Sequence, residues 1–516
     1  MSTTPGLSSR LIILTLSLGL LAGCTTLPKR PPLLVMSSLP PAESGMLSDF
    51  HDEIIAARGE NASAFLPLVA NRDALLFRLM LVERATTSID MQYFIWSNDA
   101  AGQLLFSKLL EASDRGVRVR LLVDNIFLQA TNRALASTGF QPNLHLKIYN
   151  PNRIRESKLG SLGEMMLNFE ELNRRMHNKV MIVDGQMAIL GGRNIGNAYF
   201  GLSDKYNFRD FDVLIVGPVV ADLTEPFDEF WNAEIAYPAE SMSRRATREG
   251  LDRLRENIER SLEENATRLA SYFEGDPEDA LDLDDLRERF EEGTGYFLQD
   301  TPVEVEGQRI RLIDMIDFAR RETTESLLVV SPYLIPSEKF LENLQALAER
   351  GVDVKLLTGS LGSNNHTIAH SHYRKYRRAL LATGASLYEF RHDPSSAIRD
   401  ITDVAPVEAG FISLHTKVLV SDRAECFVGS LNLDPRAIEI NTENGILVVS
   451  ESFCGELATH VEGLLAPSNA WRVELDEMGK MRWRAGDETL KRQPARRFTQ
   501  RIADFFYRWL PIESQL

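Results

Sequence analysis

The chain repeats itself, and this duplication restricts its fold more than any other feature of the sequence. Residues 115–122 (RGVRVRLL) recur as residues 350–357 (RGVDVKLL), and residues 177–179 (HNK) recur as residues 415–417 (HTK). The matches keep their order and a nearly constant spacing, which indicates tandem duplication of a unit of roughly 200 residues. A chain of 516 residues is long enough to hold two such units.

Both units show the same succession of hydrophobic patterns. An apolar strand is followed by an amphipathic helix and then by a strand rich in β-branched residues. Strands that alternate with helices predict βαβ units, so we expect an α/β fold of two similar units related by pseudo-two-fold symmetry. The expected strand, helix and strand cover residues 89–96, 102–113 and 117–123 in the first unit, and residues 327–335, 338–350 and 352–357 in the second.

Changes in composition divide the chain into six segments. Residues 241–300 are rich in Glu, Arg and Asp at helical spacing, so we expect an acidic helical insertion without catalytic residues. Prolines concentrated between residues 27 and 43 favour an extended tether. The expected segments are a signal peptide (1–23), a lipidated cysteine with its tether (24–63), the first unit (64–240), the insertion (241–300), the second unit (301–480) and a basic, aromatic C-terminal helix (481–516).

The amino terminus has the pattern of an export signal. Arg10 precedes an apolar run of about eleven residues, shorter than the roughly 20 that a transmembrane helix needs. Residues 21–24 (LAGC) resemble a bacterial lipobox, which predicts cleavage and lipidation of Cys24. A plain signal peptide or a short anchor is the alternative. Thr25 stands where Asp would resemble an inner-membrane retention signal, so we expect a lipoprotein of the bacterial cell envelope that faces the periplasm, on the outer rather than the inner membrane.

Charge and cysteine content count against other classes. The chain has 57 Lys and Arg against 73 Asp and Glu, a net charge of −16, so we expect no nucleic-acid partner. Three cysteines are too few for a disulfide scaffold. Cys426 and Cys454 can form at most one bridge, and the apolar sequence around Cys426 favours a buried free thiol.

Each unit carries one copy of the spaced motif H-x-K-x4-D-x6-G-[GS]-x-N. In the first copy, two apolar runs flank Asp184 and Gly185, a strong signal for a hairpin turn. A hairpin would return Asn194 to the side of His177 and Lys179, whose side chains share one face of a strand. The motif residues are His177, Lys179, Asp184 and Asn194 in the first copy, and His415, Lys417, Asp422 and Asn432 in the second.

These residue types suit chemistry at phosphorus. A neutral imidazole can attack phosphorus or carry a proton near neutral pH. Lysine supplies positive charge and asparagine a neutral donor, and both favour a developing phosphoryl oxyanion. Two such sets that face each other would place a nucleophile on one side of phosphorus and a general acid on the other.

The paired motifs resemble the HKD motifs of the phospholipase D superfamily. Residues 173–179 (NRRMHNK), 191–196 (GGRNIG) and 431–436 (LNLDPR) are similar to bacterial cardiolipin synthases of the C group. The resemblance extends from about residue 65 to residue 516. It implies two phospholipase D-like α/β sandwich units with one active site at their interface.

The resemblance also implies roles for the motif residues. His177 would be the nucleophile of a phosphatidyl-histidine intermediate, and His415 the general acid and later the base. Asp184 and Asp422 fall in the hairpin turns, so we expect them to be structural. No cofactor or metal is expected, because the lysines supply the positive charge and no spacing suits zinc. The phosphate oxygens would be held by Lys179, Lys417, Asn194 and Asn432.

Each histidine needs a carboxylate on its other ring nitrogen to fix its orientation. The family pattern points to Asp210 and Glu443, while Asp212 shares a strand face with Asp210 and stays open as an alternative. Two further residues, His370 and Tyr373, match positions typical of the C group and suggest contact with lipid headgroups. Basic and aromatic residues are interleaved between residues 496 and 511. This pattern fits either a helix that lies in a membrane interface or a helix packed on the rest of the protein.

The resemblance favours a membrane-associated phosphatidyltransferase that makes cardiolipin from phosphatidylglycerol, with phosphatidylethanolamine as a further candidate donor. The expected partners are phospholipids and a bacterial membrane. Hydrolysis of phospholipids to phosphatidic acid is the alternative within the same chemistry. A phosphodiesterase acting on nucleic acid, or a lipid-binding protein without activity, fits two intact motifs and the acidic charge less well.

Overall fold

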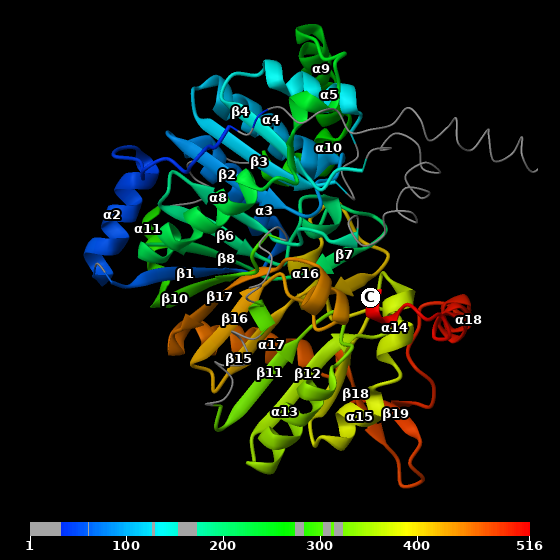
Figure 1. Cartoon of the computed structure of the whole chain (residues 1–516). Coiled ribbons are helices and arrows are strands. Elements are labelled where there is room, and N and C mark those ends of the chain that lie inside the picture. The colour runs from blue at the N-terminus through cyan, green and yellow to red at the C-terminus, as the bar shows by residue number, and fades with distance from the viewer. Residues whose placement is uncertain are drawn as a thin grey trace, which may run out of the picture.

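A computed structural model of the chain describes residues 32, 34–59, 61–125, 130–152, 173–273, 283–302, 311–313 and 323–515. These residues form two halves of similar architecture, which lie side by side with the first half drawn in blue to green and the second in yellow-green to red (Figure 1). Each half is built on one β-sheet that carries helices, and the two sheets meet in the middle of the molecule. The expected α/β fold of two similar units is confirmed.

The sheet of the first half has the order β9-β4-β3-β2-β5-β6-β8-β1. Strands β2, β3 and β4 are parallel to one another, and the other pairings are antiparallel. The strands are β1 (Ser63–Leu68), β2 (Ser88–Tyr93), β3 (Arg118–Asp124), β4 (Leu144–Tyr149), β5 (Val180–Val183), β6 (Met187–Gly191), β8 (Asp212–Val216) and β9 (Ala236–Pro238).

The second half repeats this order as β18-β13-β12-β11-β15-β16-β17-β10, with β11, β12 and β13 parallel. Two further strands, β19 and β20, extend its outer edge. The strands are β10 (Glu291–Gln299), β11 (Ser326–Val330), β12 (Asp353–Gly359), β13 (Ser386–Phe390), β15 (Val418–Ser421), β16 (Glu425–Gly429), β17 (Asn444–Val449), β18 (Ala470–Leu475), β19 (Met481–Ala485) and β20 (Glu488–Leu490).

Strand β10 joins the two sheets. Its first residues, 291–293, pair with β1 of the first half, and residues 294–299 pair with β17 of the second. Within the described part of the chain, 18 strands therefore form one hydrogen-bonded sheet. The halves are connected by backbone hydrogen bonds as well as by side-chain packing.

Successive side chains of each strand point to opposite faces of the sheet, and this alternation divides the hydrophobic core into layers. In β5, Met181 and Val183 belong to the core under helices α3 (Asn71–Arg84) and α4 (Ala100–Asp114), whereas Val180 points the opposite way. Val180 belongs to a cluster that also contains residues of β15 and β16. That cluster includes helices α8 (Thr224–Asn232) and α17 (Glu451–Leu465), and the halves share it.

The other helices lie around these layers. Helix α13 covers the second sheet as α4 covers the first. The helices are α2 (Met46–Arg58), α5 (Asn132–Ser137), α9 (Arg248–Glu264), α10 (Ala266–Leu269), α11 (Leu283–Glu288), α13 (Glu338–Glu349), α14 (Thr367–Tyr373), α15 (Arg377–Ala382), α16 (Ser396–Thr402) and α18 (Phe498–Tyr507).

The predicted hairpins are confirmed. β5 and β6 are antiparallel and meet at a turn in which Asp184 and Gly185 have φ of 53° and 66°. β15 and β16 form the matching hairpin, with Asp422 and Arg423 at φ of 49° and 56°. The left-handed conformation suits Asp184, Gly185 and Asp422, whereas Arg423 adopts it without the residue type that favours it.

Three segments differ from the sequence-based prediction. The insertion expected to be helical ends in strand β10. The strand begins with two glutamates, so its sequence did not indicate the alternating burial that the structure shows. The expected C-terminal helix is preceded by strands β19 and β20, so α18 occupies only ten residues of it. In the expected tether, residues 46–58 form α2, with Leu47 and Phe50 buried against the first half.

The extended residues before α2 are also held on the first half. Arg120 is buried beside Asp90, and its guanidinium donates to the carbonyl of Met36 at 2.9 Å and to Ser38 Oγ at 2.9 Å. The backbone N–H of Ser38 donates to Asp228 at 2.7 Å. Proline content predicted the extended backbone of this part of the tether but not these docking contacts.

Cys426 and Cys454 form a disulfide with their Cα atoms 5.6 Å apart. The expectation of a free thiol at Cys426 is wrong. Cys426 lies on β16, and Cys454 lies on α17, which follows the neighbouring strand β17 and packs back over the sheet. The apolar run around Cys426 correctly indicated burial, but it carried no information on which helix would cover the strand.

No helix within the described ranges is long and apolar enough to cross a membrane. Cys24 and the lipobox lie outside the described residues.

Candidate active site

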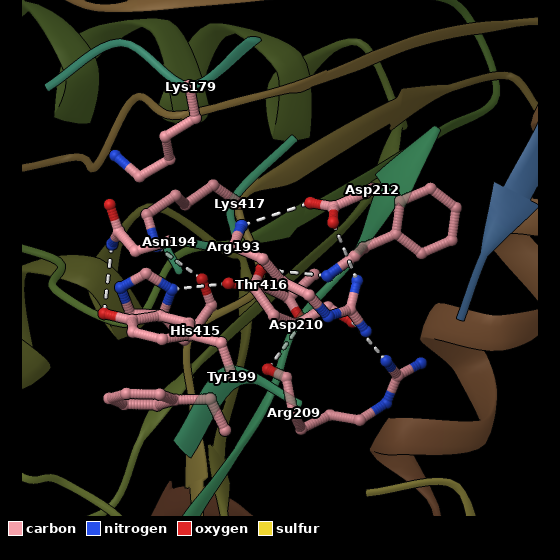
Figure 2. Close-up of polar contacts among 12 residues, drawn as sticks. Lys179, Arg193, Asn194, Tyr199, Arg209, Asp210, Asp212, His415, Thr416 and Lys417 are labelled. Carbon is pink, nitrogen blue, oxygen red and sulfur yellow. Dashed lines mark hydrogen bonds and ion pairs between the residues drawn. The ribbon is translucent and has the colours of Figure 1, made fainter. Parts of the chain in front are cut away.

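His415 is placed by a strand pairing between the two halves. β14 (Ile412–Leu414) runs parallel to β7 (Asn207–Arg209), and the next residues along these strands are His415 and Asp210. Because partners in a parallel pair advance together, the two side chains meet. The backbone N–H of His415 donates to the carbonyl of Arg209 at 2.9 Å, and His415 Nδ1 lies 2.5 Å from Asp210 Oδ2 (Figure 2).

His177 is placed in the same way on the other side of the interface. Met176 forms a parallel bridge with Thr442, and the next residues are His177 and Glu443. The backbone N–H of His177 donates to the carbonyl of Thr442 at 2.9 Å. His177 Nδ1 lies 2.7 Å from Glu443 Oε2.

The two histidine–carboxylate pairs are therefore exchanged between the halves. Glu443 and Asp210 have no exposed surface, and the histidines are 7% and 5% exposed. A carboxylate on Nδ1 holds a proton there and leaves Nε2 for a substrate. The sequence indicated both carboxylates but not the exchange, because nothing in the spacing says which half a strand end will face.

Asp212 has a different partner. Its carboxylate binds Arg78 at 2.8 Å and Arg193 at 3.4 Å, and all three side chains are buried. The alternative that Asp212 orients a histidine is therefore wrong. This ion-pair cluster fixes the start of β8, directly after the loop that carries Asp210.

The two carboxylates have unequal surroundings. The hydroxyl of Ser430 donates to Glu443 Oε2, the same oxygen that faces His177. The matching position in the first half is Gly192, where a Cβ atom would lie 2.3 Å from Asp210 Oδ1. Among the described residues, Glu443 therefore receives a hydroxyl donor that has no counterpart at Asp210. The motif position is Ser in one half and Gly in the other, and this difference makes the site asymmetric.

The two motif lysines are buried and close enough to influence each other. Lys179 Nζ donates to the carbonyl of His177, and Lys417 Nζ donates to the carbonyl of His415. Burial lowers the pKa of Lys179 to about 7 and that of Lys417 to about 8. The negative charges of Asp210 and Glu443 act in the opposite direction and raise both pKa values. Figure 2 shows Lys179 and Lys417 pointing toward the region above His415. Buried cations of this kind favour a bound anion.

Burial also makes both imidazoles weakly basic. It lowers the pKa of His177 well below the usual value, with the charges of Lys179 and Lys417 adding to the effect. It lowers the pKa of His415 to about 3, with Lys417 as the next cause. Both rings are therefore neutral at neutral pH, the form in which an imidazole is a nucleophile. Aromatic rings pack on them: Phe94 lies 4.8 Å from His177 between ring centroids.

Tyr199 is a site residue that the sequence analysis did not identify. Its ring packs edge-on against His415 at 5.3 Å between centroids, and its hydroxyl accepts from Asn194 Nδ2 at 3.0 Å (Figure 2). Asn194 Oδ1 in turn accepts the backbone N–H of Ile95. The motif fixed the position of Asn194, but Tyr199 follows it in a short 3₁₀ turn with no pattern to distinguish it from a core tyrosine.

Asn432 differs from its counterpart Asn194. It is buried, with 7% of its surface exposed, and its Oδ1 has no hydrogen-bond partner among the residues that the structure describes. A buried amide oxygen without a partner costs free energy unless a ligand or water pairs with it. Asn432 is therefore the motif asparagine best placed to meet a ligand.

The motif aspartates support the loops that lead into β2 of the first half and β11 of the second. Asp184 accepts the backbone N–H groups of Thr86, Thr87 and Ser88 at 2.8–2.9 Å. Asp422 accepts those of residues 324–326 at 2.8 Å. Both carboxylates lie at the turn end of their hairpins, away from the histidines, as the structural expectation requires.

His370 and Tyr373 lie behind the surface. His370 Nδ1 contacts Asp504 at 2.8 Å and its Nε2 contacts Arg377 at 3.1 Å. The hydroxyl of Tyr373 donates to Glu389 at 2.9 Å. Both side chains are buried and their polar atoms have protein partners, so the structure does not support direct contact with a lipid headgroup.

No group of three or more His, Cys, Asp and Glu side chains in the described ranges is placed to hold a metal ion.

Two segments match the family model described as "Cardiolipin synthase, PLD-like domain", at residues 79–231 and 312–465. They contain both histidines, both lysines and both orienting carboxylates. The chain belongs to the cardiolipin synthase family of phospholipase D-like enzymes. The two matched segments are the two repeats of the sequence.

Individual members of the family agree with this assignment. Cardiolipin synthase C of Escherichia coli (strain K12) is 33% identical over 469 residues, which cover 87% of this chain and 95% of that protein. Cardiolipin synthase A of Pseudomonas aeruginosa (strain LESB58) is 29% identical, over 75% of this chain and 64% of that protein. Among solved structures, the phosphatidylserine synthase of Haemophilus influenzae Rd KW20 has the same fold, with a TM-score of 0.53 and 14% identity over 91% of this chain and all of that one.

Proposed function

We propose that this enzyme is a phosphatidyltransferase that joins two phosphatidylglycerol molecules into cardiolipin. The observation that carries the proposal is the pair of exchanged histidine–carboxylate contacts, His177 with Glu443 and His415 with Asp210. Two oriented imidazoles and two buried lysines supply a nucleophile, a proton carrier and positive charge for a phosphodiester.

In the first step, Nε2 of His177 attacks phosphorus of the donor lipid. The bond to the headgroup oxygen breaks, and His415 gives that oxygen its proton. In the second step, His415 removes the proton of an acceptor hydroxyl, and the acceptor oxygen displaces His177 from phosphorus. The proton and the histidine are both recovered, so one phosphodiester is exchanged for another.

The general acid must hold a proton that its low pKa in the free protein disfavours. An anionic phosphodiester between Lys179 and Lys417 offsets their charges, which are causes of the lowered pKa of His415. Substrate binding therefore raises the basicity of the histidine that has to carry the proton. The side-chain amides of Asn432 and Asn194 would complete the contacts by donating N–H groups to the phosphate oxygens.

The acceptor decides between synthesis and hydrolysis. Support for a lipid acceptor is the similarity to cardiolipin synthases C and A over most of the chain. Purified full-length protein on phosphatidylglycerol vesicles should form cardiolipin in excess of phosphatidic acid among early products. His177→Ala should abolish both products, and replacement of His460, a half-buried histidine on α17, by Ala should leave both unchanged. Dominant phosphatidic acid with abundant phosphatidylglycerol would identify a hydrolase instead.

The donor can be identified in cells. A cardiolipin-deficient bacterium that expresses the chain should regain cardiolipin, and the His177→Ala variant should not restore it. Labelling the phosphate of phosphatidylethanolamine distinguishes the two donors, because label enters cardiolipin directly only if phosphatidylethanolamine gives up its phosphatidyl group.

We further propose that the enzyme is a lipid-anchored protein of the bacterial cell envelope and faces the periplasm, with the outer membrane as the expected location. The lipobox at Cys24 supports the anchor. The Cys426–Cys454 disulfide supports an oxidising compartment, since such bonds persist outside the cytosol.

A further inference from the structure

The C-terminal helix α18 presents an apolar face to the outside. The exposed positions recur at helical spacing and so lie on one side of the helix and its last turn. On a soluble body such a face would ordinarily be buried, and apolar patches of this kind mark interaction surfaces. The residues and their exposed fractions are Phe498 (67%), Ile502 (44%), Phe505 (47%), Phe506 (63%) and Trp509 (69%).

The opposite side of α18 is fixed to the second half. Asp504 is completely buried, accepts from Gln493 Nε2 at 2.7 Å and pairs with His370 at 2.8 Å and with Arg374. These charge-assisted contacts set the rotation of the helix about its axis. Figure 1 shows α18 at the edge of the molecule beside α14. Because the buried Asp504 faces the body, the exposed aromatic face lies on the outer side of the helix.

A basic groove of about 540 Å³ lies next to this face. Some of its cations are ion-paired, such as Arg377 with Glu389 and Arg482 with Asp476. Lys480, Lys491 and Arg492 are exposed, in a chain whose net charge is −16. The cations that line the groove are Arg374, Arg377, Arg378, Lys480, Arg482, Lys491, Arg492 and Arg501.

The end of the chain leads from α18 toward the active site. Asn173, four residues before His177, donates to Gln515 Oε1 at 2.5 Å. Arg436 contacts both Asn173 and the carbonyl of Gln515, and its charge is one cause of the lowered pKa of His177. The chain that follows the aromatic face of α18 therefore reaches the segment directly before His177.

We propose that the aromatic face of α18 and the adjoining basic groove form a docking surface for an anionic phospholipid bilayer. Aromatic side chains enter the boundary between headgroups and acyl chains, while the cations hold the phosphate groups around them. The proposal deepens the proposed function, since it names the surface through which the lipid substrate is approached. It is separate from the lipid anchor, which holds the chain near a membrane without orienting it.

Trp509 provides a direct measurement on the full-length protein. It is exposed, whereas Trp96, Trp231, Trp471 and Trp483 are buried. The probe is a vesicle of phosphatidylglycerol and phosphatidylcholine whose acyl chains carry bromine, which quenches only fluorophores at acyl-chain depth. Emission should be quenched on these vesicles relative to unbrominated ones, and Trp509→Phe should remove the quenching even though the anchor still binds the protein.

Matched variants separate the aromatic and the basic contributions. Phe505→Ser with Phe506→Ser should abolish quenching, whereas Phe140→Ser with Phe273→Ser, exposed aromatics of the first half, should not. Neutralising Lys480, Lys491 and Arg492 to Gln should lower quenching by about twofold or more on anionic vesicles, where each surface cation contributes to binding. The control is the same charge change at the exposed Lys205, Arg244 and Arg245.

Vesicle-bound protein without Trp509-dependent quenching would overturn the proposal. So would a blue shift of Trp509 emission that rises with protein concentration in the absence of lipid, because a second copy of the chain would then cover the face. Quenching without cardiolipin formation would reject the proposed function and leave the docking surface standing. Cardiolipin formation without quenching would reject the docking surface and leave the proposed function standing.

Discussion

Glu443 lies in the second repeat, yet its carboxylate oxygen is 2.7 Å from Nδ1 of His177 in the first. His415 and Asp210 make the reciprocal contact. Neither half therefore contains a complete histidine–carboxylate pair. Duplication of the unit supplied two copies of each part, and the interface combines them.

Replacing Glu443 tests the importance of this exchange. Glu443→Gln keeps the size of the side chain but removes the charge that fixes the tautomer of His177, so kcat for phosphatidyl transfer should fall by about 10²- to 10⁴-fold. Glu439→Gln, an exposed neighbour, should keep the original rate. An unchanged kcat for Glu443→Gln would show that the contact does not serve catalysis.

The buried lysines should make anion binding depend on pH. Their pKa values are lowered to about 7 for Lys179 and about 8 for Lys417, so both are charged below pH 7 and lose their protons as the pH rises. Sulfate does not titrate in this range, and its affinity, measured by calorimetry, should fall by about tenfold or more between pH 6 and 9. Lys205→Gln should keep this dependence, and Lys179→Gln should weaken both the binding and its slope. A flat profile in the unmodified protein would contradict the lowered pKa values.

The covalent intermediate should form on His177. The assignment rests on family resemblance, and the hydroxyl of Ser430 gives its partner Glu443 a contact that Asp210 lacks. Rapid alkaline quenching of labelled lipid turnover, which preserves the acid-labile P–N bond, followed by peptide mapping, should place the labelled phosphate on the peptide that contains His177. An adduct on His415 would reverse the two roles and keep the mechanism.

The disulfide should stabilise the second half. Bridging residues 28 positions apart removes entropy from the unfolded chain, which predicts a loss of about 2–4 kcal/mol in unfolding free energy for the Cys426→Ala, Cys454→Ala double variant. Chemical denaturation of both proteins measures the difference. The purified protein should also resist thiol alkylation at these positions until it is reduced, and free labelling of Cys426 in unfolded, unreduced protein would contradict the bridge.

Lipidation should depend on Cys24. Metabolic labelling with a fatty-acid analogue should mark the expressed protein, and Cys24→Ala should remove the label. Cys426→Ala serves as the control for an unrelated cysteine. Label that persists in Cys24→Ala would mean that the lipobox is not used.

The sequence predicted the parts of the fold that repeat a local pattern. Strand β3 and helix α4 were expected within two residues of their observed ends, because alternation and helical spacing are properties of neighbouring residues. The hairpin at Asp184 was predicted from the turn residues and the two apolar runs that flank them. Strand β10 was not, since its pattern reads as a charged surface and its partners lie in two different sheets.

The candidate site was predicted as a set of residues but not as an arrangement. The motifs identified His177, Lys179 and their counterparts, because a fixed spacing survives in each copy. The partner of each histidine depends on how two distant strand ends meet, and no local pattern records that. Tyr199 was missed for the same reason: its contact with His415 exists only after the halves pack together.

Strand β10 joins the two halves into one framework. Its residues 291–293 share backbone hydrogen bonds with β1 and its residues 294–299 with β17, so one continuous strand connects the two sheets. Enzymes that close around their substrates adjust the distance between reacting groups in each cycle, whereas here that distance is set when the chain folds. For the proposed reaction, we therefore expect that access to the site, rather than closure of the two halves, selects between water and a lipid hydroxyl.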